Sequence, residues 1–224
     1  FDLAGACSGF LFGLENCSAL IESGRYKKII LVAAEKMSAI TNYEDRTTCP
    51  LFGDGAAAVL LEPTTDDLGV IDSFLRVDGL GQSHLHQKAG GSERPASIET
   101  VTNREHFVYQ EGPAVFKHAV SDMSAVTEGI MKRNHLTAAD LSWFVPHQAN
   151  MRIIEAVGKR IDLPKEKILI NIENFGNTSA ASVPLCLWDF ESRLRKGDNI
   201  ILAAFGAGFS WGSVYLKWGY DAVK

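Results

Sequence analysis

Cys7 is the first residue of this sequence whose type and position suit acyl transfer chemistry. It follows a short extended run and the turn Gly5-Ala6, and a helix-like stretch begins there. A helix N-terminus presents free N–H groups and a partial positive charge, and both favour a thiolate over a thiol. Cys7 is therefore a candidate nucleophile, with the alternative that it is a small core residue in front of a helix.

His147 and Asn177 occupy equivalent places in two later strand–helix units. His147 directly follows a predicted strand, and Asn177 opens the Asn-Thr-Ser start of a later helix. Binding crevices of α/β sheets form at such strand ends, so both side chains are candidates for a role in binding or catalysis. The structural alternatives are a hydrogen-bonded core histidine and a helix N-cap.

A glycine-rich turn between the last two predicted strands is a candidate for part of an oxyanion hole. In Gly206-Ala207-Gly208 the small residues let backbone N–H groups approach a ligand closely. The N–H groups of Cys7 and Ala207 would together hold a developing oxyanion. The alternative is a tight connection between strands.

The elements that must position these residues alternate between strands and helices, which favours an α/β fold. The helix after Cys7 is apolar almost all round, which places it inside the protein. Residues 79–107 are polar and glycine-rich, and we expect one long irregular segment there, an insertion or a lid. Strands are predicted over 28–33, 56–61, from about 70, and over 143–145, 167–171, 199–204 and 210–218; helices are predicted over about 7–23, 113–130, 150–161 and 178–196, with a short one opened by Thr137–Asp140.

The composition is typical of a globular α/β protein. The chain has 224 residues, of which 46% are hydrophobic and 22% charged, and a net charge of −5 that gives no reason to expect nucleic acid. No apolar run approaches the roughly 18 residues that span a bilayer, and no secretory signal is present, so we expect no membrane association and a cytoplasmic setting. The four cysteines lack paired spacing, which indicates neither a disulfide framework nor a metal site.

Taken together, the motifs resemble the β-ketoacyl-acyl-carrier-protein synthase III family of the thiolase superfamily. The similarity runs from Phe1 to about Trp218, and it is carried in the family's order by GACSGF (5–10), FGDGAAA (52–58), VPHQANMRII (145–154), NTSAASVPL (177–185) and AAFGAGFSWGS (203–213). The resemblance implies an α/β, thiolase-like five-layered αβαβα fold that is N-terminally incomplete, lacking about the first hundred residues. Residues 1–100 would be the remainder of the N-terminal half, with the nucleophile helix and the insertion loop, and residues 101–224 the C-terminal half.

The resemblance also implies roles for individual residues. Cys7 matches the acyl-accepting nucleophile, while His147 and Asn177 match residues that hydrogen-bond the malonyl thioester and stabilise the enolate formed on decarboxylation. The backbone N–H groups of Cys7 and Ala207 match the oxyanion hole. Further matches are the coenzyme A and substrate contacts Arg46, Phe52, Phe116 and Asn150, and the carrier-protein docking residues Lys117, Arg152, Lys159 and Arg160. For the basic residues the alternative is a solvated helix face.

The implied function is that of an acyltransferase of fatty acid biosynthesis. It condenses an acyl-CoA primer, with acetyl-CoA expected, with malonyl-acyl-carrier protein through an acyl-Cys7 intermediate, and it works as a homodimer without metal or cofactor other than the coenzyme A thioester substrate. Two alternatives stay within the fold: a specialised synthase that uses a longer or branched primer for polyketide- or quinolone-type products, and an inactive fragment. A papain-like peptidase also uses Cys, His and Asn, but Cys7 lacks the CGSCW context and the α/β alternation is wrong for it.

Overall fold

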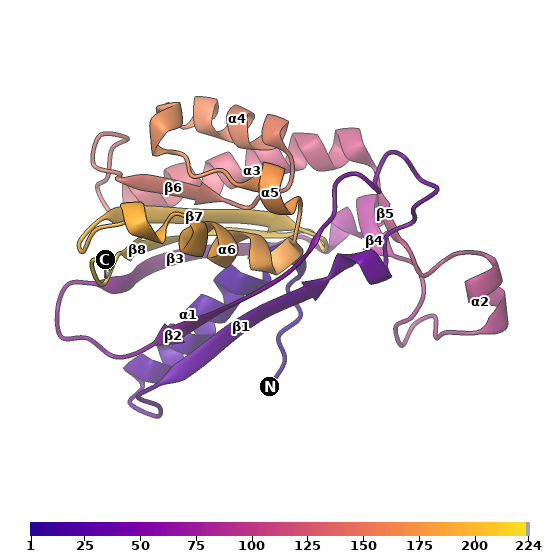
Figure 1. The fold of residues 1–224 in the computed structure, drawn as a ribbon, viewed down its shortest axis with the longest axis horizontal. Coiled ribbons are helices and arrows are strands. Elements are labelled where there is room, and N and C mark those ends of the chain that lie inside the picture. Colours follow the sequence, from indigo (N-terminus) through magenta and orange to yellow (C-terminus); the bar gives the residue numbers. More distant parts are fainter. Residues whose placement is uncertain (223–224) are drawn as a thin grey trace.

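A mixed four-stranded sheet forms the centre of the protein, in the strand order β3-β8-β7-β6 (Figure 1). The computed structural model describes residues 1–222. Strands β6 and β7 are parallel, whereas β8 runs antiparallel to both β7 and β3. Almost every residue of β7 is buried, as expected for a strand covered on both faces. The strands are β3 (Gly69–Val77), β6 (Trp143–Pro146), β7 (Asn199–Gly206) and β8 (Ser210–Lys217).

Helices cover both faces of this sheet. Ile201 and Ala203 of β7 belong to one buried cluster together with α3 (Gly112–Arg133) and α4 (Met151–Arg160). The alternate residues Ile200 and Leu202 belong to a second cluster with α1 (Gly9–Glu22) and α6 (Ser182–Asp189). This period-two division of one strand between two cores places the sheet between two helical layers.

A two-stranded ribbon forms a further layer beyond α1. Strands β1 (Ile29–Lys36) and β2 (Asp54–Leu61) pair antiparallel, and their inner face packs on α1 so closely that a Cβ on Gly13 would lie 2.7 Å from Leu31. Outer-face residues such as Ile30 and Val32 are exposed. The predicted α/β class is confirmed, and residues 1–222 contain four of the implied five layers, in the order α, β, α, β. The division at residue 100 stays a prediction.

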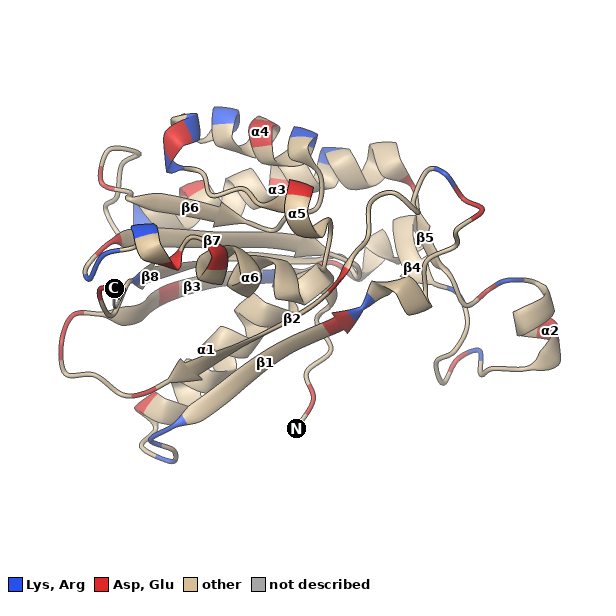
Figure 2. Cartoon of the chain, viewed as in Figure 1, with Lys and Arg blue, Asp and Glu red and all other residues tan. Residues whose placement is uncertain are grey.

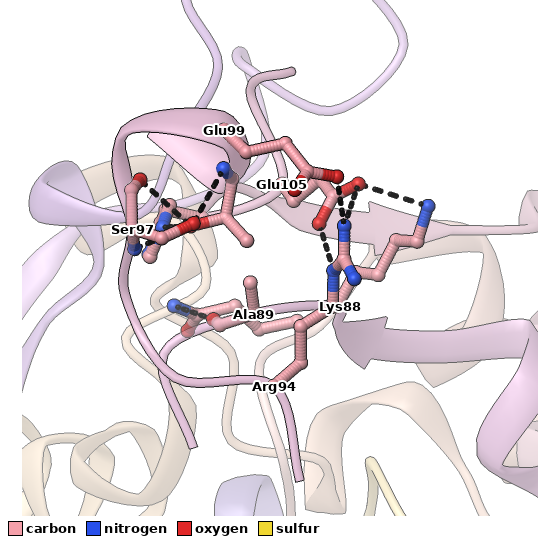
Figure 3. Close-up of polar contacts among 9 residues, drawn as sticks. Lys88, Ala89, Arg94, Ser97, Glu99 and Glu105 are labelled. Carbon is pink, nitrogen blue, oxygen red and sulfur yellow. Dashed lines mark hydrogen bonds and ion pairs between the residues drawn. The ribbon is translucent and has the colours of Figure 1, made fainter. Parts of the chain in front are cut away.

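The expected irregular structure of residues 79–107 is found only in part: short elements form over 79–87 and 98–102, while residues 88–97 and 103–107 belong to no helix or strand. The segment projects from the body around α2 (Ile98–Thr102), and its β4 (Leu85–Gln87) pairs with β5 (Val108–Gln110) (Figure 1). Ser97 and Thr100 form a capping box at the start of α2, while Arg94 and Lys88 both pair with the buried carboxylate of Glu105 (Figure 3). These contacts replace a hydrophobic core, which so polar a segment cannot build.

Other predicted elements are shorter than expected or absent. The Thr137 N–H donates the expected cap hydrogen bond of 2.8 Å to the Asp140 carboxylate, but the Thr137 hydroxyl donates to the same carboxylate over 2.6 Å, and the residues close a turn rather than open a helix. In place of the strand over 167–171 there is only a single bridge between Ile168 and Phe144. The helix over 178–196 is broken into α6 and two 3-10 turns, which let the fully buried Leu194 reach the core.

The remaining elements are short. They are α5 (Ile172–Phe175) and the 3-10 turns η1 (Ala6–Ser8), η2 (Met37–Ala39), η3 (Gly79–His84), η4 (Lys165–Lys167), η5 (Ser179–Ala181) and η6 (Glu191–Arg193). Within residues 1–222, no helix combines the length and the apolar character that a membrane crossing requires.

Candidate active site

Cys7, His147 and Asn177 line one cavity of about 730 Å³. His147 follows the carboxyl end of β6 and Ala207 follows that of the parallel neighbour β7, so the cavity lies at the edge where crevices of α/β sheets form. The tertiary structure therefore brings the predicted site residues together, although they are up to 200 positions apart in the sequence.

Cys7 lies in the 3-10 turn η1, directly against the turn between β7 and β8. A Cβ on Gly206 would lie 2.8 Å from the Cys7 backbone nitrogen, so only glycine permits this approach. The Ser8 hydroxyl donates a hydrogen bond of 2.8 Å to the Ser210 carbonyl, which ties η1 to the start of β8. Ala207, between these contacts, also lines the cavity. Cys7 and Ala207 thus both lie at the cavity wall, and their role as an oxyanion hole stays a prediction.

The Cys7 thiol keeps its proton at neutral pH. Burial raises the pKa of this thiol to about 11, and the negative charge of Glu35 adds to the rise, whereas a hydrogen bond with Ser179 lowers it. The expectation that a helix N-terminus favours the thiolate is wrong here. Helix α1 begins at Gly9 with Ser8 as its N-cap, so Cys7 lies one position before the cap, and burial makes the largest contribution to its pKa.

His147 is buried, with 1% of its surface exposed, and it is neutral. Burial lowers its pKa to about 4. Its Nδ1 lies 2.6 Å from the Ser182 hydroxyl, which also accepts a hydrogen bond from the Gln148 backbone N–H. The Ser182 proton is therefore free to be donated to Nδ1, which leaves the ring proton on Nε2. Nε2 has no partner among the described residues and remains available as a donor to a ligand.

Asn177 is held through its backbone by the loop that precedes β2. Its N–H donates to the Leu51 carbonyl over 2.8 Å, and its carbonyl accepts from the Gly53 N–H over 3.0 Å. A Cβ on Gly53 would lie 2.1 Å from the Phe175 carbonyl oxygen, which explains the glycine in the FGDG motif. Asn177 Oδ1 accepts from the Ser179 N–H over 2.9 Å. Asn177 and His147 line the same cavity.

The other predicted site residues divide into two groups. Phe52, Phe116, Asn150 and Arg152 line the cavity, and the Arg152 guanidinium lies 5.4 Å from the centre of the Phe116 ring. Asn150 is also the N-cap of α4, because its Oδ1 accepts from the Arg152 N–H. Outside the cavity lining are the exposed residues Arg46, Lys117, Lys159 and Arg160. Arg46 adjoins Thr47, which does line the cavity.

Sequence reasoning missed Glu35, Ser179 and Ser182. Ser182 contacts the His147 ring, and Ser179 lines the cavity together with Cys7 and Glu35. Both serines lie within the NTSAASVPL motif, so the motif offered a signal. Glu35 offered none beyond its place at the end of a strand. Across residues 1–222, no group of three or more His, Cys, Asp or Glu side chains is arranged to hold a metal ion.

Comparisons with known proteins place the motifs in a family context. Residues 1–79 match the family described as 3-oxoacyl-acyl-carrier-protein (ACP) synthase III, and residues 131–218 match its C-terminal family. The chain is 62% identical, over all 224 residues, to β-ketoacyl-acyl-carrier-protein synthase III 2 of Bacteroides thetaiotaomicron, and it covers 67% of that protein. It is 57% identical to the synthase III of Phocaeicola vulgatus, again over the whole chain and 67% of the relative. The chain thus spans about two thirds of the length of these relatives.

Solved structures show the same fold. The 3-oxoacyl-(acyl carrier protein) synthase III of Pseudomonas aeruginosa superposes with a TM-score of 0.89 at 36% identity, over 100% of this chain and 68% of that one. The priming β-ketosynthase from the R1128 polyketide biosynthetic pathway superposes with a TM-score of 0.87 at 31% identity, over 99% of this chain and 66% of that one. These matches confirm the thiolase-like α/β fold.

Proposed function

Because the chain belongs to the β-ketoacyl-acyl-carrier-protein synthase III family, the enzymes that initiate fatty acid synthesis, we propose that it condenses acetyl-CoA with malonyl-acyl-carrier protein through an acyl-Cys7 intermediate. The observation that carries the proposal is the meeting of Cys7, His147 and Asn177 in one cavity. We further propose that the enzyme is a cytoplasmic homodimer and that it needs no cofactor beyond the coenzyme A thioester substrate.

In the first half-reaction, Cys7 Sγ attacks the carbonyl carbon of the acyl-CoA thioester. The N–H groups of Cys7 and Ala207 hold the oxyanion of the tetrahedral intermediate. The bond between the acyl carbon and the coenzyme A sulfur then breaks, coenzyme A leaves with the proton that Cys7 gave up, and the acyl group stays on Cys7. The apolar side chains that line the cavity, such as Met123 and Phe205, limit the access of water to this thioester.

In the second half-reaction, His147 and Asn177 act on the malonyl thioester. The His147 Nε2–H and the Asn177 amide donate hydrogen bonds to its carbonyl oxygen, and they stabilise the enolate that forms as carbon dioxide leaves. His147 is neutral, so it donates a hydrogen bond without transferring its proton. The enolate carbon attacks the acyl carbon, the bond between that carbon and Cys7 Sγ breaks, and the Cys7 thiolate takes up a proton from water.

Intact-protein mass spectrometry tests this proposal. The protein is incubated with acetyl-CoA or with longer and branched acyl-CoA primers, as wild type and as Cys7→Ser. We expect one acyl group on the wild type and none on Cys7→Ser, with acetyl-CoA the fastest donor. Cys49→Ser is the matched control, because Cys49 is another partly exposed free cysteine, and it should be acylated as the wild type is. Acylation that survives in Cys7→Ser, or no acylation of the wild type by any donor, would overturn the proposal.

A further inference from the structure

Two buried serines, Ser8 and Ser210, join the turn around Cys7 to the loop that carries Ala207. The Ser8 hydroxyl donates a hydrogen bond of 2.8 Å to the Ser210 carbonyl. In return, the Ser210 hydroxyl donates to the Gly5 carbonyl over 3.2 Å. The bonded residues are 202 and 205 positions apart in the chain, so the two hydroxyls form a link that only the tertiary structure creates.

The Ser8 hydroxyl does not serve the helix that Ser8 precedes. Ser8 is the N-cap residue of α1, a position where a serine hydroxyl usually accepts a hydrogen bond from a free N–H of the first turn. Here the side chain makes no cap hydrogen bond and donates to Ser210 instead. The contact with the start of β8 therefore outweighs the local preference of an N-cap serine, which indicates a role beyond the stability of α1.

The Ser210 hydroxyl lies between two carbonyl oxygens, one from each segment. Its oxygen is 3.1 Å from the Ala207 carbonyl oxygen and 3.2 Å from that of Gly5. A hydroxyl has one proton, and both distances exceed the usual value of about 2.7–2.8 Å, so the proton is shared between the two acceptors. The Gly5 carbonyl also accepts from the Ser8 N–H over 3.1 Å, which closes the turn that contains Cys7. One hydroxyl thus contacts both segments that supply the proposed oxyanion donors.

The loop from Ala207 to Phe209 is held at both of its ends. Gly206 and Ser210, which flank it, form the last pair of the β7–β8 ladder. At the far end of the loop, Asp78 accepts a hydrogen bond of 2.7 Å from the Phe209 N–H and donates one of 2.9 Å to the Phe209 carbonyl. The Ser210 hydroxyl holds the near end, at Ala207. Loss of this hydroxyl would leave the ladder and the Asp78 contacts in place and would release Ala207 alone.

We propose that Ser8 and Ser210 are positioning residues for the oxyanion hole of the acylation reaction; this inference rests on the proposed function. Their link fixes the spacing of the Cys7 and Ala207 N–H groups, and among residues 1–222 neither N–H donates to a backbone carbonyl. Such donors stabilise an oxyanion best when they are in place before the reaction starts. Neither serine belongs to the described lining of the cavity, so both act through the backbone and not on the substrate.

The test compares two reactions of Cys7 in Ser210→Ala, by quenched-flow sampling and intact-protein mass spectrometry. Acylation passes through an oxyanion, so its rate at saturating acetyl-CoA should fall by about tenfold, with the half-saturating concentration unchanged. This loss is smaller than the roughly 10²–10³-fold cost of removing a donor outright, because the donors are displaced but present. Alkylation by iodoacetamide displaces iodide at a saturated carbon and forms no oxyanion, so its rate should stay the same. Ser210→Thr keeps the hydroxyl and should be acylated as the wild type is.

Ser8→Ala removes the other half of the link and should produce the same difference between the two reactions. In the double variant the loss should be smaller than the product of the two single losses, because both hydroxyls hold one arrangement. Ser213→Ala is the matched control: Ser213 is also a buried serine of β8, and its hydroxyl donates to a backbone carbonyl, that of Val126 in α3, over 2.9 Å. It lies outside the described lining of the cavity, so both rates should be unchanged.

The outcomes separate the two proposals. If the wild type is acylated and Ser210→Ala is acylated equally fast, the positioning role is wrong and the proposed function stands. If acylation and alkylation slow together in Ser210→Ala, or if Ser213→Ala slows acylation as much, the serines support the fold and not the oxyanion hole. If the wild type accepts no acyl group at all, both proposals fall.

Discussion

At the scale of single residues, burial decides the charge of the site more than sequence neighbours do. Burial raises the pKa of Cys7 to about 11 and lowers that of His147 to about 4. Both groups are therefore neutral at neutral pH, and the cavity carries no preformed thiolate–imidazolium pair. A neutral pair suits a site that must hold a thioester away from water, because each charge would bring a shell of water with it.

The buried His147 makes stability depend on pH. Its pKa is about 4 in the folded protein and about 6.5 when unfolded, so the unfolded chain binds the extra proton between these values. Stability is therefore lost as pH falls through this window, and the loss between pH 7.5 and 5 is about 2 kcal/mol from this residue. We expect the free energy of unfolding of His147→Gln, measured by urea unfolding, to fall less between pH 7.5 and 5 than that of the wild type. The difference between the two falls should be about 2 kcal/mol.

The control for this prediction is His135→Asn, which removes an exposed histidine at a left-handed φ of 55° that Asn tolerates. It should keep the wild-type dependence on pH. An equal loss of stability in His147→Gln and in the wild type would show that His147 is not the group that titrates.

At the scale of elements, the segment 79–107 depends on one buried carboxylate. The Glu105 side chain is 7% exposed and pairs with Arg94 and with Lys88, which lies 3.2 Å away. Hydrogen bonding from Arg94 lowers the pKa of Glu105 to about 2, so Glu105 contributes stability above the unfolded pKa, and this contribution is lost as pH falls toward 2. Figure 3 shows that the same Arg94 also reaches Glu99, at the start of α2.

We expect Glu105→Gln to destabilise this segment, because Arg94 and Lys88 lose the negative charge with which both form ion pairs. Hydrogen–deuterium exchange of the amides between residues 88 and 106 should become faster, while amides of β7 stay protected. Glu99→Gln is the matched control: its carboxylate pairs with the same Arg94 but is 73% exposed, so exchange should change little. Equal effects of the two substitutions would contradict a special role for the buried carboxylate.

At the scale of the whole molecule, several basic residues lie on one helix although the net charge of the chain is −5. Helix α4 carries Arg152, Lys159 and Arg160, and Lys117 lies on the neighbouring α3. In Figure 2 the basic positions of α4 lie on the opposite side of the molecule from those of the turn between α1 and β1. An acidic carrier protein would be steered toward α4, close to the cavity that Arg152 lines.

We therefore expect Lys159→Glu combined with Arg160→Glu to raise the KM for malonyl-acyl-carrier protein by about tenfold at low salt, and less at high salt. Acylation of Cys7 by acetyl-CoA should not change, because neither residue lines the cavity. Steady-state kinetics at two salt concentrations measure both effects. Lys27→Glu, on the exposed turn before β1, is the control and should leave the KM unchanged. A similar rise in both variants would mean that only net charge matters.

Secondary structure was predictable where the sequence pattern and tertiary packing agree. The strands β1, β2, β7 and β8 and the helices α3 and α4 appear close to their predicted bounds, because each carries a run or stripe of apolar residues that faces a core. Predictions failed where a short local sequence pattern was outweighed by contacts with residues that are distant in the chain. Thr137–Asp140 has the residues of a helix start, but the chain must extend almost at once into β6.

The sequence by itself determined the family, the candidate nucleophile with its two partners, and the α/β class. Five motifs in a fixed order carry that information, because chemistry restricts residue type at each of them. Only the tertiary structure decided that Cys7, His147 and Asn177 share a cavity, that both ionisable members are neutral, and that Glu35 and Ser179 join them. The physical reason is that burial, hydrogen-bond direction and the approach of one charge to another depend on neighbours in space, and these lie as far apart in the chain as Cys7 and Gly206.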